Sequence, residues 1–215
     1  MKLLIIIISD RFDEEWCHNI KHLNEYMKNS GIEIDYCGIS SNDDFHIYEP
    51  IINFKFKMVN SKRQLSKICD FITEYKSQLN YDWYMKTRPE IKLLDSIPFN
   101  KLSRNSINAR ARIYNGPRRI KYGMSINGEG PWKHVSGYYY SRIEHDITLD
   151  DQLYLFHNDV IRNNAFEKFS KPFLVENELA HAELFNERNI PFNVIGINLC
   201  LMNYGSFSGH ININF

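Results

Sequence analysis

The stretch MKLLIIIISDRFDEEW (residues 1–16) joins an unbroken apolar run to a cluster of charged residues. The run LLIIII at 3–8 suits a central strand buried on both faces, and it is too short for a membrane span or a signal peptide. Three consecutive acidic residues from Asp13 onward favour the first turn of a helix, which we predict over residues 13–29. The chain therefore begins as a strand, a loop and a helix.

The same alternation of strands and helices continues along the chain. Runs of β-forming residues at 32–39 and 52–59 predict two further strands. Apolar side chains at helical spacing over residues 62–79, after the capping candidates Asn60 and Ser61, predict a second helix. This order argues for an α/β fold in which helices flank a mostly parallel or mixed central sheet. Ligands of such sheets bind outside the carboxyl ends of the strands.

Composition places the chain among single-domain globular proteins. Its 215 residues are 43% hydrophobic, which is enough to bury one sizeable core. The 26 basic and 26 acidic residues balance, so no overall field favours nucleic acid or an anionic membrane surface as a partner. We therefore expect one domain over residues 1–215, with no nucleic-acid partner and no transmembrane segment.

The four cysteines lie far apart and form no CxxC pair. Each is in an apolar context, where a reduced and buried thiol is the usual state. Cys17, Cys37, Cys69 and Cys200 therefore indicate a reducing compartment, the cytoplasm, or the host cytoplasm if the protein is viral. The sequence has no His or Cys spacing typical of a zinc site. It also has no glycine-rich phosphate loop and no GxSxG elbow, which argues against a dehydrogenase, a P-loop kinase or a serine hydrolase.

The stretch YDWYMKTRPE (residues 81–90) reads as a buried strand that ends abruptly on Arg88, Pro89 and Glu90. Proline cannot donate to a sheet and biases the preceding residue toward an extended conformation. We therefore expect both charged side chains to point outward at the carboxyl edge of the sheet, which Asp10 shares. The alternative is a structural arginine or a surface ion pair, which contributes only ~0–1 kcal/mol.

The second half of the chain shows less regular periodicity. Strands are predicted over residues 106–114 and 136–143, with a long glycine-rich and basic stretch between them. Helices are predicted over 150–166 and 176–189, and a last apolar strand over 192–203. This half would complete the same domain.

The order of helix, Tyr-Asp turn, aromatic strand and charged triplet resembles the nucleotide-sugar-dependent glycosyltransferases of the GT-A fold. In that family an Asp-x-Asp triplet holds a divalent metal against the diphosphate, and Arg88-Pro89-Glu90 occupies its place. More narrowly, KTRPEI is similar to the K-x-R-x-D/E-hydrophobic signature of some bacterial surface-polysaccharide transferases, and chlorovirus capsid-glycan transferases have a comparable size and plan. The triplet departs from the family pattern because an arginine replaces the first acid.

This resemblance implies a hexosyl- or deoxyhexosyltransferase that takes a nucleoside-diphosphate sugar, with UDP as the expected nucleotide, and a glycan or glycoprotein acceptor. It assigns the nucleotide-binding half to residues 1–100 and the acceptor-binding half to 101–215. Arg88 would hold the diphosphate, while Glu90 would contact Mg²⁺ or Mn²⁺ or a ribose hydroxyl. The remaining candidates for the nucleoside are Ser9, Asp10, Arg11 and Arg63.

Sugar transfer requires a group that removes the proton of the acceptor hydroxyl, usually a carboxylate. Asp150 and Asp151 precede the helix predicted over 150–166, and N-capping would explain only one of them. We therefore predict that Asp151, beside Asp150, contacts the acceptor or acts as the base, with Glu176 or Glu178 as the next choices.

Two other classes of function stay open from the sequence. A non-catalytic α/β module could bind a nucleotide or a protein at the same edge, with Arg88 and Glu90 as a structural pair. A phosphotransferase acting on nucleotide sugars would release phosphate and would need no acceptor.

Overall fold

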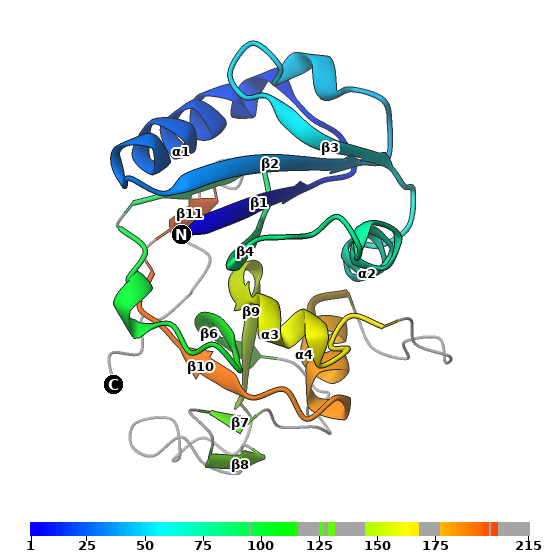
Figure 1. Cartoon of the computed structure of the whole chain (residues 1–215). Coiled ribbons are helices and arrows are strands. Elements are labelled where there is room, and N and C mark those ends of the chain that lie inside the picture. Colours follow the sequence, from blue (N-terminus) through cyan, green and yellow to red (C-terminus); the bar gives the residue numbers. More distant parts are fainter. Residues whose placement is uncertain are drawn as a thin grey trace.

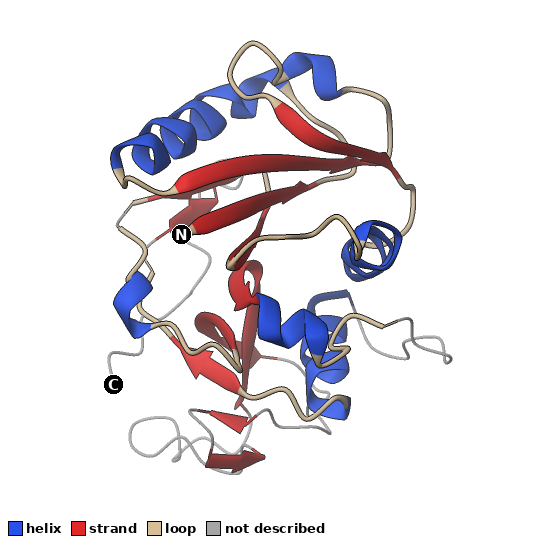
Figure 2. Ribbon diagram, viewed as in Figure 1, coloured by secondary structure: helices blue, strands red, loops and turns tan. Residues whose placement is uncertain are grey.

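The computed structural model describes residues 1–94, 96–115, 125–126, 129–131, 145–167, 177–197 and 199–201 (Figures 1 and 2). The strand predicted over 136–143 lies outside these residues. Within them, one large sheet runs through both halves of the chain, as expected for a single α/β domain.

Four parallel strands form the first half of the sheet, in the order β3-β2-β1-β4. Their bounds are Lys2–Ile8 for β1, Glu33–Ser40 for β2, Phe54–Val59 for β3 and Trp83–Thr87 for β4. Strand β1 is central, because its alternate side chains are buried on both faces of the sheet. The structure thus confirms the strands predicted for this half.

The sheet continues through strands of the second half. Across the described residues it has nine strands in the order β3-β2-β1-β4-β9-β6-β10-β7-β8. Strand β9 is antiparallel to both β4 and β6, which makes the sheet mixed. The added strands are β6 (Ile107–Asn115), β7 (Ser125–Ile126), β8 (Glu129–Pro131), β9 (His145–His157) and β10 (Phe192–Val194).

The helix predicted over residues 150–166 is wrong for most of its length. Residues up to His157 belong to β9, and only a five-residue helix, α3 (Asn158–Arg162), follows. A short apolar run buried on both faces has no period that separates strand from helix. Pairing with β4 and β6 on its two sides settles this segment as a strand.

The last predicted strand, over 192–203, is also two elements. Strand β10 joins the large sheet, whereas β11 (Leu199–Leu201) pairs antiparallel with β5 (Ile91–Leu93) in a separate two-stranded sheet. The segment is apolar as predicted, but it is not one continuous strand, because residues 195–197 belong to neither β10 nor β11.

Helices cover both faces of the parallel half (Figure 1). Helix α1 (Cys17–Asn29), entered through the 3₁₀ helix Glu14–Trp16, packs on one face of this half, and α2 (Gln64–Tyr75) packs on the other. Helix α4 (Asn177–Glu187) packs against β9 of the second half and against α2. Two further 3₁₀ helices span Phe45–Ile47 and Phe99–Lys101. The helices predicted over 13–29 and 176–189 are confirmed, and the one predicted over 62–79 is shorter at both ends.

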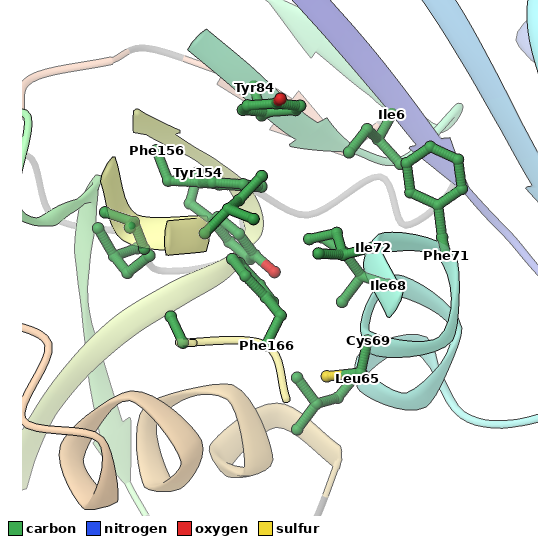
Figure 3. Packing of buried hydrophobic residues seen from close by; sticks show 14 of the residues in the cluster. Ile6, Leu65, Ile68, Cys69, Phe71, Ile72, Tyr84, Tyr154, Phe156 and Phe166 are labelled. Carbon is green, nitrogen blue, oxygen red and sulfur yellow. The ribbon is translucent and has the colours of Figure 1, made fainter. Parts of the chain in front are cut away.

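An apolar core joins α2 to the middle of the sheet (Figure 3). Leu65, Ile68 and Ile72 of α2 face the aromatic side chains of Tyr154 and Phe156 on β9. Burying each aliphatic side chain of this kind contributes roughly 1.5–3 kcal/mol, so the packing fixes the position of α2 relative to the sheet. Among the described residues, no helix is both long enough and apolar enough to cross a membrane.

Candidate functional site

The carboxyl ends of β1, β2 and β4 meet at one edge of the sheet. The register pairs Ile7 of β1 with Thr87 of β4, so residues 9–10 and 88–90 emerge side by side. Strand β9 runs in the opposite direction, and its Tyr154 pairs with Lys86, which brings the preceding residues of β9 to the same edge. The edge predicted from the sequence is therefore present and includes part of the second half of the chain.

A buried lysine of α2 organises the end of β1. Lys67 is 0% exposed, and its Nζ donates to the Ser9 carbonyl oxygen at 2.6 Å, to Asp10 Oδ1 at 2.7 Å and to Ser41 Oγ at 2.9 Å. A lysine ammonium has three donors, and all three are used here. Lys67 thus ties the loops after β1 and β2 to the helix.

The carboxylate of Asp10 stays in contact with solvent despite this partner. Its side chain is 82% exposed, whereas the side chain of Lys67 is 0% exposed. The hydrogen bond from Lys67 holds the pKa of Asp10 below its usual value, and the charge of Arg88 acts in the same direction. Asp10 is therefore an ionised, outward-facing acceptor at the sheet edge.

The other predicted nucleoside residues lie on two separate segments, the end of β1 and the start of α2. Ser9 is buried, and its Oγ accepts a hydrogen bond from the backbone N–H of Arg11 at 3.3 Å. The Arg11 guanidinium lies over the Trp16 ring at 5.8 Å from its centroid. Arg63 is exposed and occupies the N-cap position of α2, so the helix begins at Gln64 instead of following Asn60 or Ser61.

Residues 88–91 form a tight turn. The N–H of Ile91 donates to the Arg88 carbonyl oxygen at 3.1 Å, and Pro89 stands at the second position, which its fixed φ suits. Asn19 of α1 donates to the Pro89 carbonyl oxygen at 3.1 Å and anchors the turn to the helix. The triplet is therefore a rigid link from β4 to β5.

The expectation that both charged side chains of the turn point outward is wrong for Glu90. The Glu90 side chain is 7% exposed and is paired with Arg88, whose side chain is 31% exposed. The chain reverses at Pro89 and carries Glu90 under the edge, while Arg88 keeps part of its guanidinium in solvent. Arg88 alone of this pair can reach a ligand directly.

Glu90 was also the predicted ligand for a divalent metal. Mg²⁺ and Mn²⁺ need oxygen ligands with room for bound water, and magnesium usually keeps several waters. Glu90 offers a buried carboxylate with one oxygen on Arg88 and the other, Oε2, without a hydrogen-bond partner among the described residues. No group of three or more His, Cys, Asp or Glu side chains in the described part of the chain could hold a metal. These residues do not fit a protein-held metal centre.

A second buried lysine, Lys86, belongs to β4 and pairs with β9. Lys86 is 0% exposed, donates to Gln64 Oε1 at 3.1 Å and to the carbonyl oxygen of Asp151, and lies over the Tyr154 ring. Burial is the main cause that lowers the pKa of Lys86 to about 8; the charge of Asp151 opposes this shift and that of Arg88 adds to it. Lys86 fixes the backbone of β9 at the point where it enters the edge.

The predicted catalytic acids lie on this strand and do not cap a helix. Asp150 is 0% exposed, and its Oδ2 accepts hydrogen bonds from Arg110 Nε at 3.0 Å and Nη2 at 2.5 Å. Asp151 is 6% exposed. Glu176 lies outside the described residues, as does the side chain of Glu178. The N-capping interpretation of the acidic pair fails because the segment is a strand.

Behind β9, His181 of α4 shares a hydrogen bond of 3.1 Å with the Tyr154 hydroxyl through Nδ1. Burial lowers the pKa of His181 well below its usual value, and the charge of Lys86 adds to this, so the ring is neutral. Together with Lys86, this pair forms a polar seam inside the core beneath the edge.

The sequence did not reveal that three cations, Lys67, Lys86 and Arg110, are buried. A signal existed for Lys86, because period-two alternation puts it on the same buried face as Tyr84. Lys67 stands beside the apolar stripe of its helix, and nothing in the local pattern links it to Asp10.

Comparison with known proteins supports the description of the fold and goes no further. No protein-family model matches the sequence, and no curated protein matches it. The structure is similar to that of a Bacillus anthracis protein described as a glucose-1-phosphate thymidylyltransferase in complex with sucrose, with 13% identity and a TM-score of 0.51 over 93% of this chain and 89% of that chain. The chain has a GT-A-like α/β fold.

A second similar structure is that of a mutant Drosophila β-1,4-galactosyltransferase 7 in complex with manganese, UDP-Gal and xylobiose. It has 12% identity and a TM-score of 0.45 over 100% of this chain and 71% of that chain. Likeness at such identities reports the path of the chain and not its chemistry. The closer resemblance to the KxRxD/E transferases and to the chlorovirus enzymes stays a prediction.

Proposed function

We propose that this chain is a glycosyltransferase that moves a sugar from a nucleoside-diphosphate sugar, most simply a UDP-sugar, to a hydroxyl group of a glycan or glycoprotein. The observation that carries the proposal is the meeting of Asp10 and Arg88 at the carboxyl edge of the β3-β2-β1-β4 sheet. Edges of this kind are where α/β sheets bind nucleotides. In this proposal residues 1–100 bind the donor and residues 101–215 bind the acceptor.

The two side chains suit the two polar parts of a nucleotide diphosphate. An ionised carboxylate accepts hydrogen bonds from ribose hydroxyls, and a guanidinium donates two parallel bonds to phosphate oxygens. Asp10 is exposed, and Arg88 keeps part of its side chain in solvent on the neighbouring strand end. Ser9, Arg11 and Arg63 would line the nucleoside side of the same site.

Arg88 would neutralise the diphosphate as it leaves, since no protein-held metal fits the described residues. The bond between the acceptor oxygen and the anomeric carbon would form while the bond from that carbon to the diphosphate breaks. Asp151 is our candidate to take the proton of the acceptor hydroxyl, from a strand position that Lys86 fixes. Asp150 is not a candidate, because it is committed to Arg110 in the interior.

The experiment that tests the proposal has two stages. Calorimetric titration with UDP, GDP, CMP and ADP, each with Mn²⁺ and with EDTA, measures nucleotide binding. Consumption of UDP-sugars, with and without glycan acceptors, then measures transfer. Selective binding of one nucleoside diphosphate and acceptor-dependent consumption support the proposal, and failure to bind any nucleotide overturns it.

A non-catalytic nucleotide-binding module is the second candidate. The burial of Asp150 and Asp151 favours it, because neither presents an open carboxylate to an acceptor. Nucleotide binding without consumption of any nucleotide sugar would favour this module over the transferase.

A further inference from the structure

We propose that Lys67 is the positioning residue that presents the carboxylate of Asp10 to the ribose hydroxyls of the bound nucleotide. This inference rests on the proposed function and adds a residue that selects ribonucleotides over their deoxy forms. It makes the first turn of α2 part of the nucleotide site, although Lys67 itself touches no ligand.

The first support is the saturation of the buried ammonium. Burying a charge is costly unless it is paired and hydrogen-bonded. Lys67 is fully buried, and its three hydrogen bonds reach Ser9, Asp10 and Ser41 on the loops that follow β1 and β2. With every donor in use, the ammonium has one position, and the groups that it binds are held by it.

The second support is the difference in exposure between Lys67, which is buried, and Asp10, which is exposed. An exposed aspartate normally samples several rotamers, yet Asp10 Oδ1 is held by Lys67 at 2.7 Å and by Ser41 Oγ at 3.3 Å. No hydrogen bond to Oδ2 occurs among the described residues, and the side chain is 82% exposed. One carboxylate oxygen is therefore fixed, and the other is directed to solvent as an acceptor.

The backbone around Asp10 is held as well. The Asp10 carbonyl oxygen accepts the N–H of Ser41 at 3.3 Å and the side-chain amide of Asn42 at 3.3 Å. The loops after β1 and β2 are thus joined to each other by hydrogen bonds. An ion pair needed only for stability would gain nothing from leaving its carboxylate in water, whereas a binding group requires that exposure.

Affinities for UDP, 2′-deoxy-UDP and 3′-deoxy-UDP test this inference by calorimetry. We expect the natural protein to favour UDP over at least one deoxy form by about tenfold, the scale of a hydrogen bond to a charged group. Lys67→Met and Asp10→Asn should each reduce that preference to about twofold or less. The double variant should bind UDP no more weakly than Asp10→Asn, because the two residues act as one unit.

Two further variants keep the test decisive. Lys55→Met removes a lysine that pairs with Asp35 at 2.6 Å on the outer strands, and it should leave the ribose preference unchanged. Ser41→Ala removes one partner of Lys67 without burying a new group, and it should lower the preference by about threefold even if Lys67→Met does not fold.

The outcomes separate this inference from the proposed function. If the natural protein binds no nucleotide, the proposed function fails. If it prefers the ribonucleotide and folded Lys67→Met or Ser41→Ala keeps the full preference, Lys67 has only a structural role and the inference is overturned. A preference lost in both Lys67→Met and Asp10→Asn, with non-additive effects, supports it.

Discussion

Arg110 and Asp150 form a charge pair inside the protein, with Nε and Nη2 of the arginine on the same carboxylate oxygen at 3.0 and 2.5 Å. The side chains are 6% and 0% exposed. The second carboxylate oxygen accepts the N–H of Gln152 at 3.2 Å. The pair bridges β6 and β9 where their register shifts, so its main effect is on the structure of the sheet.

Removing one partner of this pair should destabilise the fold strongly. Asp150→Ala leaves the Arg110 guanidinium buried without its counter-charge, and we expect a loss of about 3–5 kcal/mol in the free energy of unfolding. Urea unfolding measures this loss. The double change Arg110→Met with Asp150→Leu should recover most of it, because no buried charge is left.

The matched control is an exposed pair. Glu33→Ala breaks the contact of 3.1 Å with Lys2, whose side chain is 52% exposed, and should cost only ~0–1 kcal/mol. A loss in Asp150→Ala as small as this one would contradict a structural role for Asp150 and return it to the catalytic candidates.

Arg88→Lys should weaken UDP binding about tenfold, because lysine cannot form the two parallel bonds of a guanidinium with phosphate. The thermal midpoint should change little, since the lysine can still pair with Glu90. Calorimetry and thermal unfolding on the same sample separate the two effects. Arg104→Lys changes an arginine that pairs with Asp159 at 3.4 Å beyond the other end of β9, and its UDP affinity should match the natural protein.

Removal of divalent metal should leave nucleotide binding largely intact. The basis is the burial of Glu90 and its pairing with Arg88, which leave the described residues without a metal site. UDP affinities measured in EDTA and in Mn²⁺ should agree within about threefold, less than one charge-assisted bond would contribute. An affinity that collapses in EDTA and returns with Mn²⁺ would show that a metal takes part.

The lowered pKa of Lys86 should make the free energy of unfolding increase with pH. Its pKa is lowered to about 8 in the folded protein, so between pH 8 and the ordinary lysine value of 10.5 the unfolded chain binds more protons. The free energy of unfolding of the natural protein should therefore rise with pH across this window relative to Lys86→Met, by a total on the order of 3 kcal/mol.

Below pH 8 the difference between these two proteins should be flat. The charged groups that act on Lys86 are Arg88, Glu90, Asp150 and Asp151, and they are present in both proteins, so the difference between the two proteins reports the titration of Lys86. Urea unfolding at pH 7 and pH 10 measures the change. Equal differences at both pH values would mean that Lys86 keeps an ordinary pKa.

Asp151→Asn tests the proposed base. The amide keeps the shape of the side chain but cannot take a proton, so transfer to an acceptor should fall by about 10²-fold or more while UDP affinity is unchanged. Transfer that persists in this variant would assign the base to another residue.

Local signals in the sequence were sufficient where one element decides its own state. The run at 3–8 is apolar at every position and became β1, and the acidic turn after it starts the helical segment as predicted. The segment at 150–157 has no such signal, because both its faces are buried and its partners β4 and β6 are far away in the chain.

The sequence by itself determined the α/β order of the first half, the parallel edge and the presence of Asp10 and Arg88 on it. Only the tertiary structure decided which charges are available, because the partners are distant: Lys67 and Asp10 are 57 positions apart, and Arg110 and Asp150 are 40 apart. Whether a carboxylate stays exposed to solvent or is buried in an ion pair depends on where the fold places its cationic partner, and therefore on how α2, β6 and β9 pack. Asp10 stays open at the edge, whereas Glu90 and Asp150 are committed within the fold.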